Sequence, residues 1–176
     1  MKQLIQDIFG DCKFPDTDCN GSFENTNLFK FHVCDPPPEH NKPAKIVSDI
    51  DEYQLTVINN NGHNIWFVKT DKCLLENDKS KCDCLLFSDE IFCFVEIKNS
   101  KSSSRSTQRA KAIEQLEATI INFKGNGINF SHIITKAIIC FNSNNDYPIQ
   151  ASKKTQQAIF AEKYQVSLEE GNKIEF

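Results

Sequence analysis

The sequence predicts an α/β protein, a single domain over residues 1–176 with a mixed central sheet flanked by helices. Three observations predict this class. Runs rich in β-branched and aromatic residues alternate with Asn, Asp and Gly turns between residues 53 and 98. A helical apolar pattern follows to about residue 123, and a further apolar run at 132–141 has the composition of a central strand. A chain of 176 residues is also long enough to bury a sizeable core.

Composition and charge exclude several classes of protein. Apolar residues make up 39% and charged residues 25% of the chain, and no apolar run approaches the roughly 20 residues of a membrane-spanning helix. The net charge of −4 argues against coating nucleic acid through overall charge. Residues 1–7 do not resemble a secretory signal. We therefore expect a cytoplasmic protein without a membrane partner.

The first elements are a helix and a hairpin. Residues 2–9 place Leu4, Ile5, Ile8 and Phe9 on one helical face, and this helix is predicted to end at Gly10. Residues 11–50 read as irregular, with an extended surface segment at the prolines 36–38. Strands at 53–58 and 65–68 are predicted to pair through a turn at Asn61-Gly62, the second strand continuing toward residue 75.

A second predicted hairpin brings two acids together. Strands at 82–87 and 91–98 are joined by a short turn at Asp89-Glu90, and this register places Asp83 opposite Glu96. Lys98 lies two residues further along the same face. Directly opposed carboxylates repel each other, so the pair calls for a cation between them. The alternative is an exposed sheet face where Lys98 and water screen both acids, although nearly continuous apolar strands favour a covered sheet.

The remaining elements follow a basic segment. Residues 98–111 contain five basic residues and no acid, and Lys101, Arg105, Arg109 and Lys111 are predicted to contact nucleic-acid phosphates. The alternative is a solvated flexible loop. A helix capped at Ser104, Ser106 or Thr107 should run to about Phe123. After the strand at 132–141, we expect a helix at 152–163 and a terminal hairpin of 165–168 with 173–176 around Gly171.

The eight cysteines allow two interpretations. Without a secretory segment, and with four cysteines in predicted strands, we expect reduced, buried thiols. The alternative is a zinc site formed by Cys73, Cys82, Cys84 and Cys93, although their spacing lacks the close pairs typical of such sites.

The ensemble of strand, acid, hairpin, acid-x-Lys and helix resembles the PD-(D/E)xK nuclease superfamily. The motifs that carry the resemblance are 82–87 (CDCLLF) and 94–98 (FVEIK), within a core of about residues 50–141. The resemblance implies a restriction-endonuclease-like fold with Asp83, Glu96, Lys98 and a helical glutamine at the site. Gln115 resembles that glutamine, and Gln108 is the competing candidate. The upstream acid of the family has four candidates here: Glu24, Glu39, Glu52 and Glu76. Asp71 is another acid expected nearby, because its strand should neighbour the strand of Asp83.

The chemistry of such a site requires a hard divalent ion. Mg²⁺ or Mn²⁺ prefers oxygen ligands, which Asp83, Glu96 and the backbone carbonyl of Ile97 can supply. Lys98 would orient the attacking water or stabilise charge in the transition state.

These residues predict a Mg²⁺- or Mn²⁺-dependent nuclease, with DNA as the substrate implied by the resemblance. A homodimer or a partner protein is expected to supply targeting, because little of the chain lies beyond the core. The resemblance to small members of the superfamily implies a defence or mobile-element system as the context. The alternatives are a catalytically degenerate nuclease-like binding module and a cysteine-metal regulator.

Overall fold

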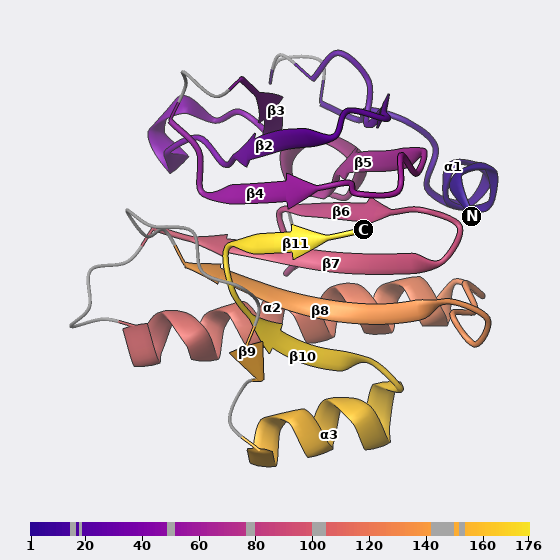
Figure 1. The fold of residues 1–176 in the computed structure, drawn as a ribbon, viewed down its shortest axis with the longest axis vertical. Helices are drawn as coiled ribbons and strands as arrows, with labels where there is room; N and C mark the ends of the chain where they lie inside the picture. The colour runs from indigo at the N-terminus through magenta and orange to yellow at the C-terminus, as the bar shows by residue number, and fades with distance from the viewer. Residues whose placement is uncertain are drawn as a thin grey trace.

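The protein is a mixed α/β structure with two sheets (Figure 1). A computed structural model describes residues 1–14, 17, 19–48, 52–76, 80–99, 105–141, 150–151 and 154–176. Its helices are α1 (Lys2–Phe9), α2 (Arg105–Gly125) and α3 (Lys154–Tyr164), with a short 3₁₀ helix η2 (Pro38–His40) and a helical turn η3 (Thr70–Leu74). None of the helices in this part of the chain combines the length and apolar character that crossing a bilayer requires.

The larger sheet has seven strands in the order β1-β5-β6-β7-β8-β10-β9. Strands β5, β6 and β7 form an antiparallel meander, and α2 then connects β7 to β8, which runs parallel to it. Strand β10 is parallel to β8, whereas β9 is antiparallel to β10. The bounds are β1 (Phe23–Thr26), β5 (Ile65–Lys69), β6 (Cys84–Phe87), β7 (Ile91–Lys98), β8 (Ile134–Phe141), β9 (Gln150–Ala151) and β10 (Ser167–Glu170).

The smaller sheet has four strands in the order β11-β4-β2-β3. Strand β2 pairs antiparallel with β3 and β4, and β11 joins β4 in parallel. In Figure 1 this sheet lies in front of the larger sheet, whereas α2 lies behind it. The bounds are β2 (Lys30–Cys34), β3 (Lys45–Val47), β4 (Leu55–Ile58) and β11 (Lys173–Glu175).

The side chains of β7 alternate between two apolar cores. Phe92 and Phe94 pack in the core that contains the buried faces of α1, α2 and α3. Val95 and Ile97 pack in the core shared with the smaller sheet. Both faces of the central strands are therefore covered, as their nearly continuous apolar sequence predicts. By this alternation, Glu96 projects to the face on which α2 packs.

Several predicted elements are confirmed. Helix α1 ends at Gly10, whose φ of +80° suits glycine and whose N–H donates to the Gln6 carbonyl. Helix α2 buries the predicted apolar face, including Leu116 and Phe123. Strands β6 and β7 pair in the predicted register, with Cys84 opposite Val95.

The two other predicted hairpins are wrong for the same reason. Strands β4 and β5 are consecutive in the chain yet belong to different sheets, and so do β10 and β11. Between β4 and β5, the Asn59 side chain both accepts from the His63 N–H and donates to the His63 carbonyl, at 2.8 Å each. Gly62 has a positive φ, but Asn61 does not, so the chain does not make the type I′ turn. The closed loop carries the chain from one sheet to the other.

The prediction that residues 11–50 are irregular is also wrong. Strands β1, β2 and β3 are three to five residues long, and two of them pair with strands distant in sequence. Their sequences are too short to show a clear alternation. The predicted continuation of the second strand toward residue 75 is replaced by η3, in which Lys72 has a φ of +54° and the Thr70 hydroxyl donates to the Cys82 carbonyl.

Candidate functional site

Asp83 and Glu96 lie across the hairpin of β6 and β7, as the sequence predicts. Asp83 immediately precedes β6, and its N–H donates to the Val95 carbonyl at 3.1 Å, which extends the pairing beyond the strand. Its Oδ2 accepts from the Ile97 N–H at 2.6 Å. Glu96 is 0% exposed and Asp83 is 7% exposed. The two acids are thus held on rigid backbone inside the protein.

Lys98 connects these acids to α2. Its Nζ forms an ion pair with Glu96 Oε1 and donates to Gln115 Oε1 at 2.7 Å. Gln115 in turn donates from Nε2 to the Lys81 carbonyl at 3.0 Å. Of the two glutamines considered from the sequence, Gln115 is the one that contacts Lys98. The amide fixes the ammonium group from one side while the carboxylate attracts it from the other.

The electrostatics of the site are dominated by buried acidic groups whose charged forms are disfavoured. Burial raises the pKa of Glu96 to about 8, although the Lys98 charge acts in the opposite direction. Burial and the neighbouring Glu96 raise the pKa of Asp83 well above its usual value. Among the described residues, Glu96 Oε2 is one of two buried side-chain oxygens or nitrogens without a hydrogen-bond partner. A buried acceptor without a partner is costly, and a cation would satisfy it.

A third acid, Asp35, is not predicted from the sequence. It directly follows β2, and its backbone N–H donates to Gln54 Oε1 at 2.8 Å. Burial raises the pKa of Asp35 to about 6, and its negative charge contributes to the raised pKa values of Asp83 and Glu96. The sequence contains one usable signal, an acid directly after the short run 31–34 (FHVC), in which three of the four residues are apolar. That run lies within the segment predicted to be irregular.

Asp71, the further acid expected near Asp83, belongs to the hydrogen-bond network of the site. Its Oδ1 is 3.3 Å from Lys81 Nζ, and the backbone N–H groups of Thr70 and Asp71 both donate to the Asp83 carbonyl. Its charge also raises the pKa of Glu96. The four candidates for the upstream acid lie elsewhere: Glu24 pairs with Lys69, Glu39 is exposed in η2, Glu52 lines a cavity with Cys34, and the backbone of Glu76 accepts from Lys81.

The predicted phosphate-contacting residues differ in their surroundings. Arg105 and Arg109 both pair with Glu170 of β10, with Nη2 to carboxylate distances of 2.8 and 2.6 Å. Their guanidinium groups also lie over the Phe141 ring, 4.5 and 5.7 Å from its centroid. Lys111 is exposed on α2. Lys101 lies outside the described residues.

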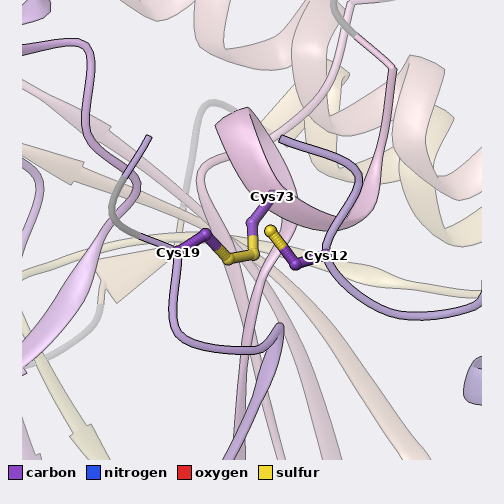
Figure 2. A group of neighbouring side chains, drawn as sticks. All are labelled: Cys12, Cys19 and Cys73. Carbon is purple, nitrogen blue, oxygen red and sulfur yellow. A yellow bond between two sulfur atoms is a disulfide. The ribbon is translucent and has the colours of Figure 1, made fainter. Parts of the chain in front are cut away.

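The cysteine prediction is correct for one group and wrong for another. Cys82, Cys84 and Cys93 are free and buried, as expected. Cys19 and Cys73 instead form a disulfide, because the loop after α1 crosses η3 and brings the two residues together (Figure 2). The predicted zinc set of Cys73, Cys82, Cys84 and Cys93 is not assembled. Within the described part of the chain, the group of three metal-ligating side chains is Cys12, Cys19 and Cys73.

No protein-family model, curated protein or solved structure matches this chain. The chemistry of the site therefore has to be argued from its own geometry. Two opposed buried carboxylates, one orphaned carboxylate oxygen and a lysine held in place form an arrangement suited to a hard divalent cation and a negatively charged substrate.

Proposed function

We propose that the protein is a metal-dependent nuclease with a restriction-endonuclease-like core that hydrolyses phosphodiester bonds in nucleic acid, with DNA as the substrate. The observation that carries the proposal is the orphaned Glu96 Oε2, buried beside Asp83 while Lys98 holds the other Glu96 oxygen. Most buried polar atoms have a hydrogen-bond partner, so the missing partner of this oxygen supports a cation beside it. The antiparallel meander followed by α2 and a parallel strand agrees with the core implied by the resemblance.

The oxygen donors fit Mg²⁺ or Mn²⁺. Asp83 and Glu96 would hold the ion together with the backbone carbonyl of Ile97, and Asp35 and Asp71 add negative charge nearby. Such an ion would offset the burial and the mutual repulsion that raise the pKa values of Asp83 and Glu96. When bound, it supplies an acidified water molecule and neutralises charge on the phosphate. Asp35 and Asp71 also argue against a catalytically degenerate nuclease-like binding module, because such a module would lack an upstream acid.

Lys98 and Gln115 have separate roles in this proposal. The ammonium group of Lys98 would donate hydrogen bonds to the attacking water or to the phosphate as negative charge develops there. Gln115 does not need to touch the substrate, because its Oε1 already fixes the position of the Lys98 ammonium group. Preorganisation of this kind removes the cost of ordering the lysine during the reaction.

The basic residues of α2 supply affinity. Lys111 is exposed and can contact the phosphate backbone, whereas phosphate would compete with Glu170 for Arg105 and Arg109. Such contacts position nucleic acid without reading its sequence. We propose that a homodimer or a partner protein supplies targeting, and that the protein acts in the cytoplasm.

A cleavage assay tests the proposal. Wild-type protein with Mg²⁺ or Mn²⁺ should cut duplex DNA, with single-stranded DNA and RNA as comparison substrates. Lys98→Ala should reduce cleavage about 100-fold or more, because it removes a group that acts on the transition state, and should leave DNA affinity nearly unchanged. The matched control is Lys136→Ala, which removes a strand lysine that also pairs with a glutamate, Glu169. It should cleave like wild type.

The degenerate-module alternative has a distinct outcome. Wild-type protein that binds Mn²⁺ and nucleic acid but cuts none of the three substrates would favour it. Cleavage that survives Lys98→Ala unchanged would place the active site elsewhere. A melting temperature that Mn²⁺ leaves unchanged would remove the basis for the metal site, because an ion that binds the folded state must stabilise it.

A further inference from the structure

The second cluster of chemically reactive side chains consists of three cysteines. The Sγ atoms of Cys12, Cys19 and Cys73 all lie within 4.8 Å of one another. Cys12 and Cys19 belong to the loop after α1, and Cys73 belongs to η3 (Figure 2). A disulfide needs two sulfurs, so the bond between Cys19 and Cys73 does not account for the third thiol beside it.

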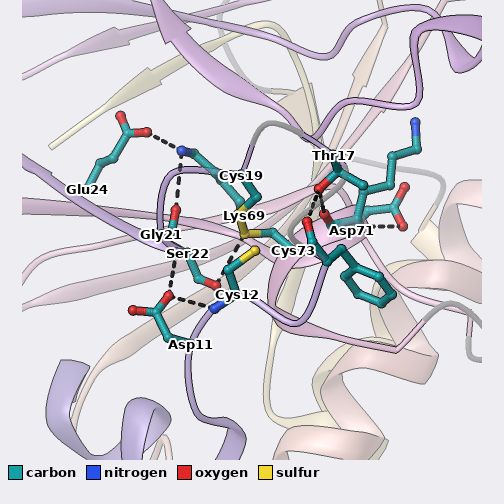
Figure 3. The surroundings of a disulfide bond; sticks show 12 residues. Asp11, Cys12, Thr17, Cys19, Gly21, Ser22, Glu24, Lys69, Asp71 and Cys73 are labelled. Carbon is teal, nitrogen blue, oxygen red and sulfur yellow. Dashed lines mark hydrogen bonds and ion pairs between the residues drawn. A yellow bond between two sulfur atoms is a disulfide. The ribbon is translucent and has the colours of Figure 1, made fainter.

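The loop that carries Cys12 and Cys19 is held in place by hydrogen bonds independent of the sulfurs. Asp11 Oδ1 accepts from the N–H groups of Cys12 and Ser22, at 2.8 and 2.6 Å, and so closes the loop at its base. Thr17 Oγ1 donates to the Lys72 carbonyl at 2.8 Å, which ties the loop to η3 (Figure 3). The three sulfurs would therefore stay close after the disulfide is reduced.

The surroundings of the sulfurs suit a bound cation. The Ser22 hydroxyl lies 3.3 Å from Cys73 Sγ and can donate to a thiolate. Cys73 is fully buried, whereas Cys12 is partly exposed, so an ion can enter from the Cys12 side. Thiolates are soft ligands that select Zn²⁺ over Mg²⁺, and three of them leave one position of a tetrahedral ion open.

We propose that Cys12, Cys19 and Cys73 form a thiolate site that binds one Zn²⁺ ion in the reduced protein. The disulfide is the metal-free, oxidised form of the same site. A dithiol reductant transfers two electrons and two protons to the Cys19–Cys73 disulfide, giving two thiols while the reductant becomes a disulfide. Binding of Zn²⁺ by the three thiolates then releases three protons.

Co²⁺ is the probe for the test, because it occupies tetrahedral thiolate sites and gives them visible colour. Full-length protein is reduced with dithiothreitol, desalted without oxygen and titrated with Co²⁺. We expect sulfur-to-cobalt charge-transfer bands that saturate at one ion per chain and disappear when Zn²⁺ is added. Oxidised protein should lack these bands, because its disulfide removes two of the three ligands.

Two variants test whether the charge-transfer bands come from the sulfur atoms of this cluster. Cys12→Ser should weaken Co²⁺ binding about tenfold or more and lose charge-transfer intensity, because one thiolate ligand is removed. Cys34→Ser removes another partly exposed free cysteine outside the cluster and should bind like wild type. Binding at Asp83 and Glu96 cannot imitate the result, because oxygen ligands give no sulfur-to-cobalt band.

A measurement on wild-type protein keeps the test independent of variant folding. Zn²⁺ should protect Cys12, Cys19 and Cys73 of the reduced protein from alkylation and leave Cys34 as reactive as before. Three outcomes would each overturn the proposal. They are the absence of charge-transfer bands in the reduced wild type, equal spectra for Cys12→Ser and wild type, and equal alkylation with and without Zn²⁺.

Discussion

The protein has two reactive clusters that are built in opposite ways. The oxygen cluster (Asp83, Glu96, Lys98 and Gln115) stands on neighbouring strands and on the helix that packs against them. The sulfur cluster (Cys12, Cys19 and Cys73) stands on a loop and a helical turn, and its disulfide joins residues 54 positions apart. Figure 1 shows strands β6 and β7 and helix α2, which carry the oxygen cluster, and Figure 3 shows the sulfur cluster on its loop and turn. Secondary structure fixes the first cluster, whereas tertiary contacts fix the second.

The clusters should also have opposite effects on stability. The oxygen cluster buries carboxylates whose raised pKa values show that their charged forms are disfavoured in the folded protein. The sulfur cluster contains a cross-link, which limits the freedom of the unfolded chain. They meet at η3, because Thr70 and Asp71 donate to the Asp83 carbonyl while Cys73 lies in the same turn. The comparison therefore predicts that the buried acids of the oxygen cluster destabilise the folded protein, although the proposed function needs them. It also predicts that the disulfide of the sulfur cluster stabilises the folded protein.

The largest expected effect is that of Glu96→Gln. It removes a proposed metal ligand, so metal-dependent cleavage should fall on the order of a thousandfold, equivalent to several kcal/mol of transition-state stabilisation. The metal-free variant should nevertheless gain at least about 1.4 kcal/mol of unfolding free energy at neutral pH, the equivalent of one pKa unit. Cleavage assays and urea unfolding with a chelator present measure the two effects.

Glu169→Gln is the matched control for this variant, because Glu169 also lies in a strand and pairs with a lysine, Lys136. It should change neither cleavage nor metal binding. If Glu96→Gln instead lowers the stability of the metal-free protein, the buried acid is a structural ion pair with Lys98, and the proposed opposition between function and stability is wrong.

Reduction of the disulfide should have the next largest effect. Opening the Cys19–Cys73 bond should lower the unfolding free energy by about 2–4 kcal/mol, because the unfolded chain regains the freedom of a long loop. Urea unfolding with and without dithiothreitol in the presence of a chelator measures the loss. Cys19→Ser should be insensitive to the reductant, and Cys34→Ser should respond like wild type. Equal stability of oxidised and reduced protein would show that the sulfur cluster contributes nothing through its cross-link.

The same contrast explains which parts could be predicted from sequence. The facing of Asp83 and Glu96 follows from a short turn and the two-residue period of strands. Gln115 is expected only from the family resemblance, with Gln108 as the competing candidate, and the structure places Gln115 against Lys98. Asp35 and the sulfur cluster depend on which distant segments meet. No local pattern shows that β2 ends beside the oxygen cluster or that Cys19 reaches Cys73. The two wrong hairpins have the same origin, because consecutive strands entered different sheets.

The pH dependence of stability sharpens the description of the oxygen cluster. Burial raises the pKa of Glu96 from 4.5 to about 8, so between these pH values the folded protein keeps a proton that the unfolded chain releases. The unfolding free energy of the metal-free protein should therefore fall as pH rises from about 4.5 to about 8. Asp35 and Asp83 act in the same direction, because their pKa values are also raised.

Unfolding of wild type and Glu96→Gln across this pH range isolates the contribution of one group. The stability difference between the two proteins should widen as pH rises and should reach at least about 1.4 kcal/mol at the alkaline end. A difference that stays constant over the whole range would show that Glu96 titrates alike in folded and unfolded protein. The raised pKa would then have no thermodynamic consequence.

The smallest expected effect concerns Arg105 and Arg109 in the first turns of α2. Glu170 pairs with Arg105 and Arg109, so Glu170→Gln should remove the carboxylate that competes with phosphate for both guanidinium groups. A partly exposed ion pair contributes about 0.2–1 kcal/mol, which corresponds to a rise in affinity for duplex DNA of up to about fivefold. A plot of the logarithm of the binding constant against the logarithm of the salt concentration should steepen by about 0.9 for each additional phosphate that the protein neutralises.

Glu169→Gln makes the same change in net charge on the same strand. Because Glu169 pairs with Lys136 and not with the arginines, this variant controls for charge alone. A salt titration of binding for both variants measures the effect, and equal behaviour would show that Arg105 and Arg109 serve the fold and that nucleic acid binds elsewhere.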